Sequence, residues 1–176
     1  MPRNIEVKAR IDSVDALLPR ARALADGPAQ TIAQDDTFFV CAQGRLKLRD
    51  FGNGSGELIH YHRADGSGPK LSDYVRVPTD QPVALREALQ RAQGVLGRVR
   101  KTRWLLLTGQ TRIHLDRVEG LGDFLELEVE LREGQDAADG AAIADALCAQ
   151  LGIAPEQRLA GAYLDLLLAR SAQRGG

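Results

Sequence analysis

The chain carries two hydrophobic periodicities, one typical of strands and one typical of helices. Apolar residues recur at every second position in eight segments, which is the pattern of strands with one buried face. These segments are residues 3–11, 34–41, 44–51, 56–64, 71–78, 95–107, 110–118 and 122–133. Most connections between them are short, so neighbouring strands are expected to pair antiparallel. The pattern predicts an α+β fold built on one large antiparallel sheet.

Helical periodicity appears in four further segments, each with an apolar stripe along one side. They lie at residues 14–21, 85–92, 143–151 and 155–167. Ser13 is placed to cap the first helix, and Gly94 and Gly152 to end the second and third. The fourth is expected to begin at Pro155. Four amphipathic helices require an apolar sheet surface to cover.

The polar positions of the strands are mostly charged. If helices cover the apolar face of the sheet, the charged face is either open to solvent or folded inward. Eight strands can close into a barrel wide enough for one ligand, which would place the charges inside. Such charges must pair with one another, with metals or with a ligand. We therefore expect an eight-stranded antiparallel β-barrel with a charged lumen, flanked by amphipathic helices; an exposed charged surface is the alternative.

Charges of both signs fall on this one face. The cations are Lys8, Lys47, Arg49, Arg63, Lys101, Arg103 and Arg112, and the carboxylates are Glu6, Asp116, Glu126 and Glu128, with Glu130 as a further candidate. On this assignment the cations outnumber the carboxylates. Carboxylates suit hard divalent cations such as Mg²⁺, whereas Lys and Arg suit phosphate oxygens. Electrostatics alone favours a site for a metal-bound polyphosphate.

Composition limits the classes of function. The chain has 176 residues with 23 Lys+Arg and 24 Asp+Glu, a formal net charge of −1, which argues against a surface that grips nucleic acid or an anionic membrane. Cys41 and Cys148 form no disulfide framework and suit the reducing cytosol, and no apolar run reaches the about 20 residues of a membrane span. We expect a cytoplasmic protein with one domain over residues 1–170 and a frayed tail at 171–176. The oligomeric state stays open, a homodimer included.

Several blocks of the chain, in order, resemble one family. Asn4-Ile5-Glu6-Val7-Lys8 resembles the ExExK strand of the CYTH superfamily, the triphosphate tunnel metalloenzymes. Residues 44–49, 60–63 and 101–103 look like the family's basic blocks, residues 113–128 like its acidic block, and residues 163–167 like its terminal helix. The resemblance covers nearly the whole chain, and the order of the blocks is more specific than any one of them.

The resemblance implies an eight-stranded tunnel that holds a triphosphate and a metal. Its implied phosphate ligands are Lys8, Lys47, Arg49, Arg63, Lys101, Arg103 and Arg112, of which Lys8, Lys101 and Arg103 are the catalytic candidates. Its implied ligands for Mg²⁺ or Mn²⁺ are Glu6, Asp116, Glu126 and Glu128. One position departs from the family pattern, because Asn4 stands where ExExK has its first Glu. The site therefore has one negative charge fewer than the motif provides.

Three functions, two of them reactions, are consistent with this resemblance. The first is that of class IV adenylyl cyclases, which convert ATP to cyclic AMP and pyrophosphate. The second is hydrolysis of thiamine triphosphate, inorganic triphosphate or a nucleoside triphosphate. The third possibility is a binder of triphosphate or polyphosphate that performs no catalysis. A small triphosphate molecule is the expected partner in each, and neither nucleic acid nor a membrane is expected.

A few further residues keep two interpretations each. His60 and His62 share a strand face and either chelate a metal or form polar surface. His114 shares a face with Asp116 and either touches the substrate or has no part in it. The glycine-rich segment 65–70 either closes over the substrate or is an ordinary hairpin loop.

Overall fold

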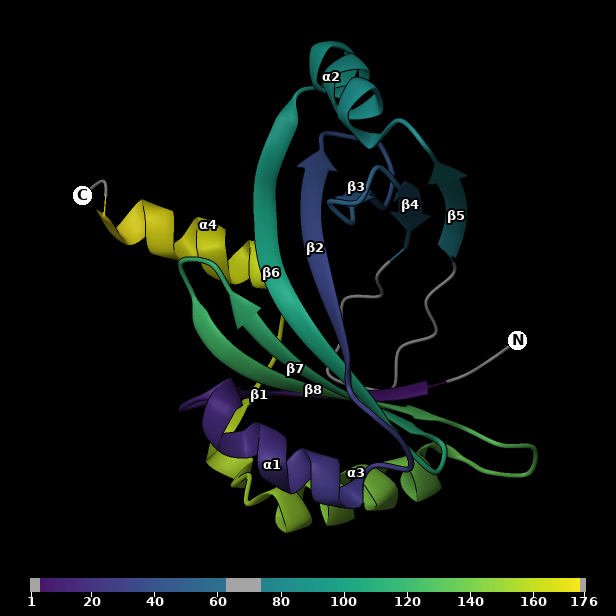
Figure 1. Ribbon diagram of the computed structural model, residues 1–176. Coiled ribbons are helices and arrows are strands. Elements are labelled where there is room, and N and C mark those ends of the chain that lie inside the picture. Colours follow the sequence, from purple (N-terminus) through teal and green to yellow (C-terminus); the bar gives the residue numbers. More distant parts are fainter. Residues whose placement is uncertain (1–3, 63–73, 175–176) are drawn as a thin grey trace.

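The computed structural model describes residues 4–62 and 74–174 of the chain (Figure 1). The predicted site residue Arg63 and the segment 65–70 lie outside the described residues. The strands are Asn4–Ile11 (β1), Gln30–Phe39 (β2), Arg45–Asp50 (β3), Gly56–Tyr61 (β4), Tyr74–Thr79 (β5), Val95–Thr108 (β6), Thr111–Val118 (β7), Gly122–Glu130 (β8) and Arg158–Leu159 (β9). The helices are Val14–Leu24 (α1), Pro82–Gln93 (α2), Ala137–Leu151 (α3) and Tyr163–Arg174 (α4), with a 3₁₀ turn at Pro155–Gln157.

All nine strands form one antiparallel sheet in the order β5-β4-β3-β2-β6-β7-β8-β1-β9. Figure 1 shows the long strands β2 and β6 bending through its middle, so that the sheet curls around a concave face. The α+β class and the antiparallel sheet are confirmed. The barrel is not closed, because β5 and β9 are the two edges and no strand pairing joins β5 to β1 or β9 over the described residues.

The main hydrophobic core lies on the convex face, between α1, α3 and strands β1, β6, β7 and β8 (Figure 1). Leu125, Leu127 and Val129 of β8 are fully buried there against α1 and α3 residues such as Val14 and Cys148. Because side chains alternate along a strand, the residues between them point to the concave face. The helices therefore cover the apolar face, and the charged face is the one that the sheet curls around.

A second, smaller core closes one end of the concave face. There α4 places Tyr163 and Leu164 against Phe38, Val99 and Phe124 of the sheet. The ring centroids of Phe124 and Tyr163 are 4.9 Å apart. This cluster connects the C-terminal helix to the charged face.

The helix boundaries agree with the sequence signals except near the C-terminal end. Ser13 accepts hydrogen bonds from the amides of Asp15 and Ala16, and α2 and α3 stop at Gly94 and Gly152. The expected continuous helix from Pro155 is wrong. The chain instead makes the 3₁₀ turn and the short strand β9, and then passes through Gly161 before α4 begins.

Gly161 explains this interruption, because its φ of 101° lies outside the helical region and favours glycine. The helix α4 then continues to Arg174. Within the described residues, no helix is long and apolar enough to cross a membrane.

The close approach of α3 to β1 leads to a testable prediction at Gly140. A Cβ at this buried position would lie 2.5 Å from Cγ1 of Ile5 and 2.6 Å from Cδ2 of Leu131. We expect Gly140→Val to lower the free energy of unfolding by about 2–3 kcal/mol through overpacking. The control is Ala141→Val, next to it on the exposed side of α3, which should cost under about 1 kcal/mol of helix propensity. Equal losses in urea unfolding for both variants would contradict the tight packing.

Candidate active site

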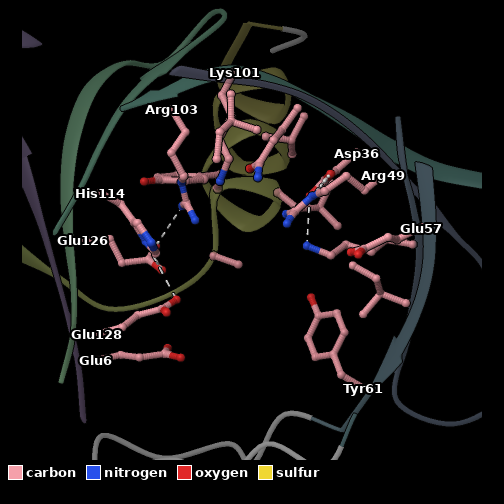
Figure 2. Close-up of a pocket in the computed structure, with 18 of the residues that line it drawn as sticks. Glu6, Asp36, Arg49, Glu57, Tyr61, Lys101, Arg103, His114, Glu126 and Glu128 are labelled. Carbon is pink, nitrogen blue, oxygen red and sulfur yellow. Dashed lines mark hydrogen bonds and ion pairs between the residues drawn. The ribbon is translucent and has the colours of Figure 1, made fainter. Parts of the chain in front are cut away.

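The concave face holds a cavity of about 500 Å³ lined by charged side chains (Figure 2). The predicted site residues that line it are Glu6, Lys8, Lys47, Arg49, Lys101, Arg103, Arg112, Glu126 and Glu128. They come from strands β1, β3, β6, β7 and β8. Sequence alternation thus places these residues around one space, although they span more than a hundred positions of the chain.

The first cationic group of the cavity is held by Asp36 of β2. Its carboxylate accepts hydrogen bonds at 2.7 Å from both Nε and Nη2 of Arg49, and at 2.8 Å from Nζ of Lys47. Burial alone would raise the pKa of Asp36, but the Lys47 ammonium and the Arg49 guanidinium lower it. Asp36 therefore stays ionised and fixes Lys47 and Arg49 of the adjacent strand β3.

The second cationic group repeats this arrangement on β6 and β7. Asp116 accepts hydrogen bonds at 2.7 Å from Nε and Nη2 of Arg103, and Nζ of Lys101 lies 3.3 Å from it. The Tyr163 hydroxyl of α4 donates a further bond to Asp116 at 2.8 Å. Burial and the neighbouring Arg103 guanidinium lower the pKa of Lys101 to about 8.

These two groups revise the charge balance expected from the sequence. Asp116 was predicted as a metal ligand, but it is fully buried behind Arg103 and does not line the cavity. Asp36 and Glu57 were missed, and both line the cavity. Over the described residues cations still outnumber carboxylates around the cavity, because seven Lys and Arg but five Asp and Glu side chains line it. Asp36 and Asp116 reduce the excess, since each offsets one of the two positive charges of a Lys-x-Arg pair. The alternation of Gln34, Asp36 and Phe38 along β2 is the signal that could have identified Asp36.

The acidic side of the cavity is formed by β1, β7 and β8. Glu126 and Glu128 of β8 lie beside His114 of β7, and Glu6 of β1 faces Glu128 across the strand ladder (Figure 2). Burial raises the pKa of Glu128, and the carboxylates of Glu126 and Glu6 add to this rise. Burial would also raise the pKa of Glu126, but His114, Lys8 and Arg103 lower it well below its usual range.

This acidic side fits a divalent cation. One donor atom each from His114, Glu126 and Glu128 lies within 4.8 Å of the others. The His114 Nδ1 atom is buried and has no hydrogen-bond partner, so it is available as a ligand. Neighbouring carboxylates that raise one another's pKa are also stabilised by a bound cation. Glu6 and Asn4 line the same cavity, with Asn4 in the place of the first motif Glu.

Lys8 and Arg112 each lie next to a carboxylate of the acidic side. The Lys8 ammonium is 3.5 Å from Oε2 of Glu126, lies 4.3 Å from the centre of the Tyr163 ring, and donates to the carbonyl of Gly161. Arg112 is more exposed, and its Nη1 is 3.8 Å from Oε2 of Glu128. Both cations can therefore reach a phosphate bound beside the carboxylates.

The two remaining histidines, His60 and His62, have different surroundings. His62 lines the cavity, whereas the His60 Nε2 atom lies 2.9 Å from the backbone carbonyl of Gln43. Their rings meet edge to face at 5.2 Å. Among the described residues, the grouping suited to a metal contains His114 and neither of these two. Tyr61 and Tyr163 also line the cavity and were not assigned to it from sequence.

The fold and the cavity together define a class of protein in which a curled antiparallel sheet carries buried Lys-x-Arg pairs beside an acidic group that could hold a metal ion. A family model of the CYTH domain matches residues 2–163. The chain therefore belongs to the CYTH family, in agreement with the resemblance of its sequence blocks.

Solved structures show the same fold. The PH1012 protein of Pyrococcus horikoshii OT3 is 23% identical, with a TM-score of 0.79 over 94% of this chain and 99% of that one. A candidate adenylate cyclase of Vibrio parahaemolyticus is 20% identical, with a TM-score of 0.75 over 94% and 97%. HpAC1 of Hippeastrum, a candidate adenylyl cyclase with a dominant triphosphatase activity, is 19% identical, with a TM-score of 0.65 over 87% and 89%. No match was found among curated proteins.

Two adjacent residues of β2 allow a matched test of the buried cationic group. Asp36 and Asp35 each pair with one arginine through two hydrogen bonds, Asp36 with Arg49 in the cavity wall and Asp35 with the partly exposed Arg98. We expect Asp36→Asn to lower the free energy of unfolding by about 3–5 kcal/mol, because two buried cations lose their partner. Asp35→Asn should cost about 0–1 kcal/mol. Urea unfolding measures both, and similar losses would contradict the assigned role of Asp36.

Proposed function

We propose that this CYTH protein is a metal-dependent enzyme that binds a small triphosphate molecule in the concave cavity and cleaves it. The first candidate reaction is conversion of ATP to cyclic AMP and pyrophosphate. The proposal includes the assignment of Mg²⁺ or Mn²⁺ to the acidic side, a cytoplasmic location, and one domain over residues 1–170.

One observation supports this proposal most directly: the cavity separates its charges into a cationic side and an acidic side. Arg49, Lys101 and Arg103 lie on the first, and Glu6, Glu126 and Glu128 on the second (Figure 2). Lys47 shares Asp36 with Arg49 and so belongs to the cationic side. A bare polyanion suits only the cationic side, and a bare cation only the acidic side. A metal-bound triphosphate carries both and matches the whole cavity.

The side-on pairing of the two arginines suits them for phosphate. Each guanidinium uses Nε and Nη2 for its aspartate, so its Nη1 is not part of that pair. The aspartates thereby hold the guanidinium planes in fixed positions before a ligand arrives. Donors fixed in advance stabilise a developing phosphate charge without reorganisation.

The residues of the chain have distinct roles in the cyclisation of ATP. The 3′-hydroxyl oxygen forms a bond to the α-phosphorus and loses its proton to solvent water, and the bond from that phosphorus to pyrophosphate breaks. Lys101 and Arg103 stabilise the charge that develops on the leaving pyrophosphate. Lys8 neutralises the charge of the phosphate that is bound beside Glu126. A divalent cation held at the acidic side would supply further charge neutralisation and lower the pKa of the attacking hydroxyl.

Hydrolysis of a triphosphate is the second candidate, and one feature of the cavity favours it. Aromatic rings could stack on a nucleobase, but Phe38 and Tyr61 each face the Lys47 ammonium, and Tyr163 faces Lys8 and Lys101. These rings serve the cationic groups. Water attack on the terminal phosphate needs the same cradle and no nucleoside pocket. HpAC1, which has the same fold, is described with a dominant triphosphatase activity.

The products separate the candidate reactions. We would incubate the protein with ATP, thiamine triphosphate or tripolyphosphate, each with Mg²⁺ or Mn²⁺ and with a chelator as control, and resolve the products chromatographically. The proposal expects metal-dependent cleavage of at least one substrate. Cyclic AMP and pyrophosphate from ATP identify the cyclase, and orthophosphate without cyclic AMP identifies the hydrolase. Tight binding of all three with no product would favour a binder and contradict an enzyme.

The substitution Asn4→Glu tests the departure from the family motif in the same assay. It restores a carboxylate to the cavity, so we expect it to increase metal affinity and to lower the metal concentration needed for half-maximal rate. Turnover by this variant alone would identify the natural chain as a disabled enzyme.

Lys101 gives a sharper test of the phosphate cradle. Lys101→Met keeps the side-chain stem but removes the charge, and should weaken ATP binding at least about tenfold, because hydrogen bonds to charged groups contribute about 1.5–3 kcal/mol. Arg100→Met, on the opposite face of β6, is the control and should change affinity less than about twofold. Isothermal titration without metal measures both. Equal effects would contradict a role of Lys101 in phosphate binding.

The lowered pKa of Lys101 predicts that the affinity of the protein for ATP depends on pH. The ammonium loses its proton as pH rises through about 8, so the affinity for ATP should fall between pH 8 and about 9.5. Lys101→Arg keeps its charge over this range and should show a shallower fall. Identical profiles for the two proteins would show that Lys101 does not control the dependence.

A further inference from the structure

We infer that the acidic side of the cavity selects a first-row transition cation such as Mn²⁺ over Mg²⁺, with His114 as the selecting ligand. The inference rests on the proposed function for the role of the metal, but it concerns the identity of the ion and can be tested without a substrate. It rests on the position of His114, its burial, and the chemistry of the donors around it.

The position of His114 suits coordination together with both glutamates. Its Nδ1 atom is 3.7 Å from Oε1 of Glu126 and 3.8 Å from Oε1 of Glu128. These separations are too long for hydrogen bonds. Two ligands that each lie about 2.1 Å from one ion can be at most about 4.2 Å apart, so Nδ1 and either carboxylate can share an ion. The full set, within 4.8 Å, needs only a small side-chain adjustment.

Burial strengthens this interpretation of His114. Only 5% of its side chain is exposed, and its Nδ1 atom is buried without a hydrogen-bond partner. A buried polar atom without a partner is costly, and native proteins contain few of them. A cation bound to the imidazole nitrogen and the two carboxylates would remove this cost.

The donor set then determines which ion is preferred. Mg²⁺ favours oxygen ligands and retains its water shell, whereas imidazole nitrogen suits transition metals. The same cavity also carries Asn4 in place of a carboxylate, which reduces the charge available to hold either dication and leaves the imidazole ligand to decide the preference. The nitrogen ligand shifts the preference toward Mn²⁺ and the metals that follow it in the first row.

Metal binding without any triphosphate tests the inference directly. We would measure Mn²⁺ binding by electron paramagnetic resonance and displace the ion with Mg²⁺. The natural chain should bind Mn²⁺ at least about tenfold more tightly than Mg²⁺. His114→Asn should weaken the binding of Mn²⁺ at least about tenfold, since even residues that only hydrogen-bond to a metal ligand contribute 10–100-fold to metal affinity. His114→Asp should retain the affinity for Mg²⁺ and lower the ratio of the Mn²⁺ affinity to the Mg²⁺ affinity. His60→Asn, at a histidine bonded to the backbone, should leave the ratio unchanged.

Pulsed electron paramagnetic resonance of Mn²⁺ bound to the natural chain adds a readout that no substitution can disturb. A coupling from an imidazole ¹⁴N nucleus is expected, and its absence would overturn the inference even if the His114 variants failed to fold. Equal affinity of the natural chain for Mn²⁺ and Mg²⁺ would also overturn it. Absence of triphosphate cleavage with selective Mn²⁺ binding intact would reject the proposed function and leave the ion preference standing.

Discussion

The architecture of the site depends on one constraint: a buried cation must have a buried anion beside it. Lys47 and Arg49 of β3 meet this constraint through Asp36 of β2, and Lys101 and Arg103 of β6 through Asp116 of β7. Desolvating these ions unpaired would cost several kcal/mol each. The two aspartates therefore make it possible for a sheet to line its concave face with four cations and remain folded.

The same pairing couples neighbouring strands in a defined register. Asp36 lies directly opposite Arg49 in the β2–β3 ladder, and Asp116 lies opposite Arg103 in the β6–β7 ladder. A slip of one residue would turn the charges toward the helix-covered face of the sheet and the apolar residues toward the cavity. The hydrophobic core on the convex face and the ion pairs on the concave face thus require the same register, and each supports the other.

Sequence alternation predicted most of the charged residues that share the cavity, although not Asp36 and Glu57, because a period of two assigns strand residues to a face. It was insufficient for what depends on lateral neighbours. Asp116 lies on the predicted face, yet Arg103 from β6 and Tyr163 from α4 surround it, so it does not line the cavity. Whether the sheet closes into a barrel likewise depends on hydrogen bonding between its edge strands β5 and β9, which are far apart in the chain. Neither property is encoded in the periodicity of a single segment.

Tyr163 shows how the C-terminal helix becomes part of the charged site. Its hydroxyl donates to Asp116, its ring packs on Phe124, and the ammonium groups of Lys8 and Lys101 lie 4.3 and 4.8 Å from the ring centre. Burial and the carboxylates of Asp116 and Glu126 raise the pKa of Tyr163, so the hydroxyl keeps its proton and remains a donor. A phenol that stays neutral adds a hydrogen bond without a further charge. It also presents the face of its ring to two cations, which an aliphatic residue could not do. The break at Gly161 ends the preceding segment and allows α4 to begin at Tyr163, which connects the helix to the core and to the cation groups.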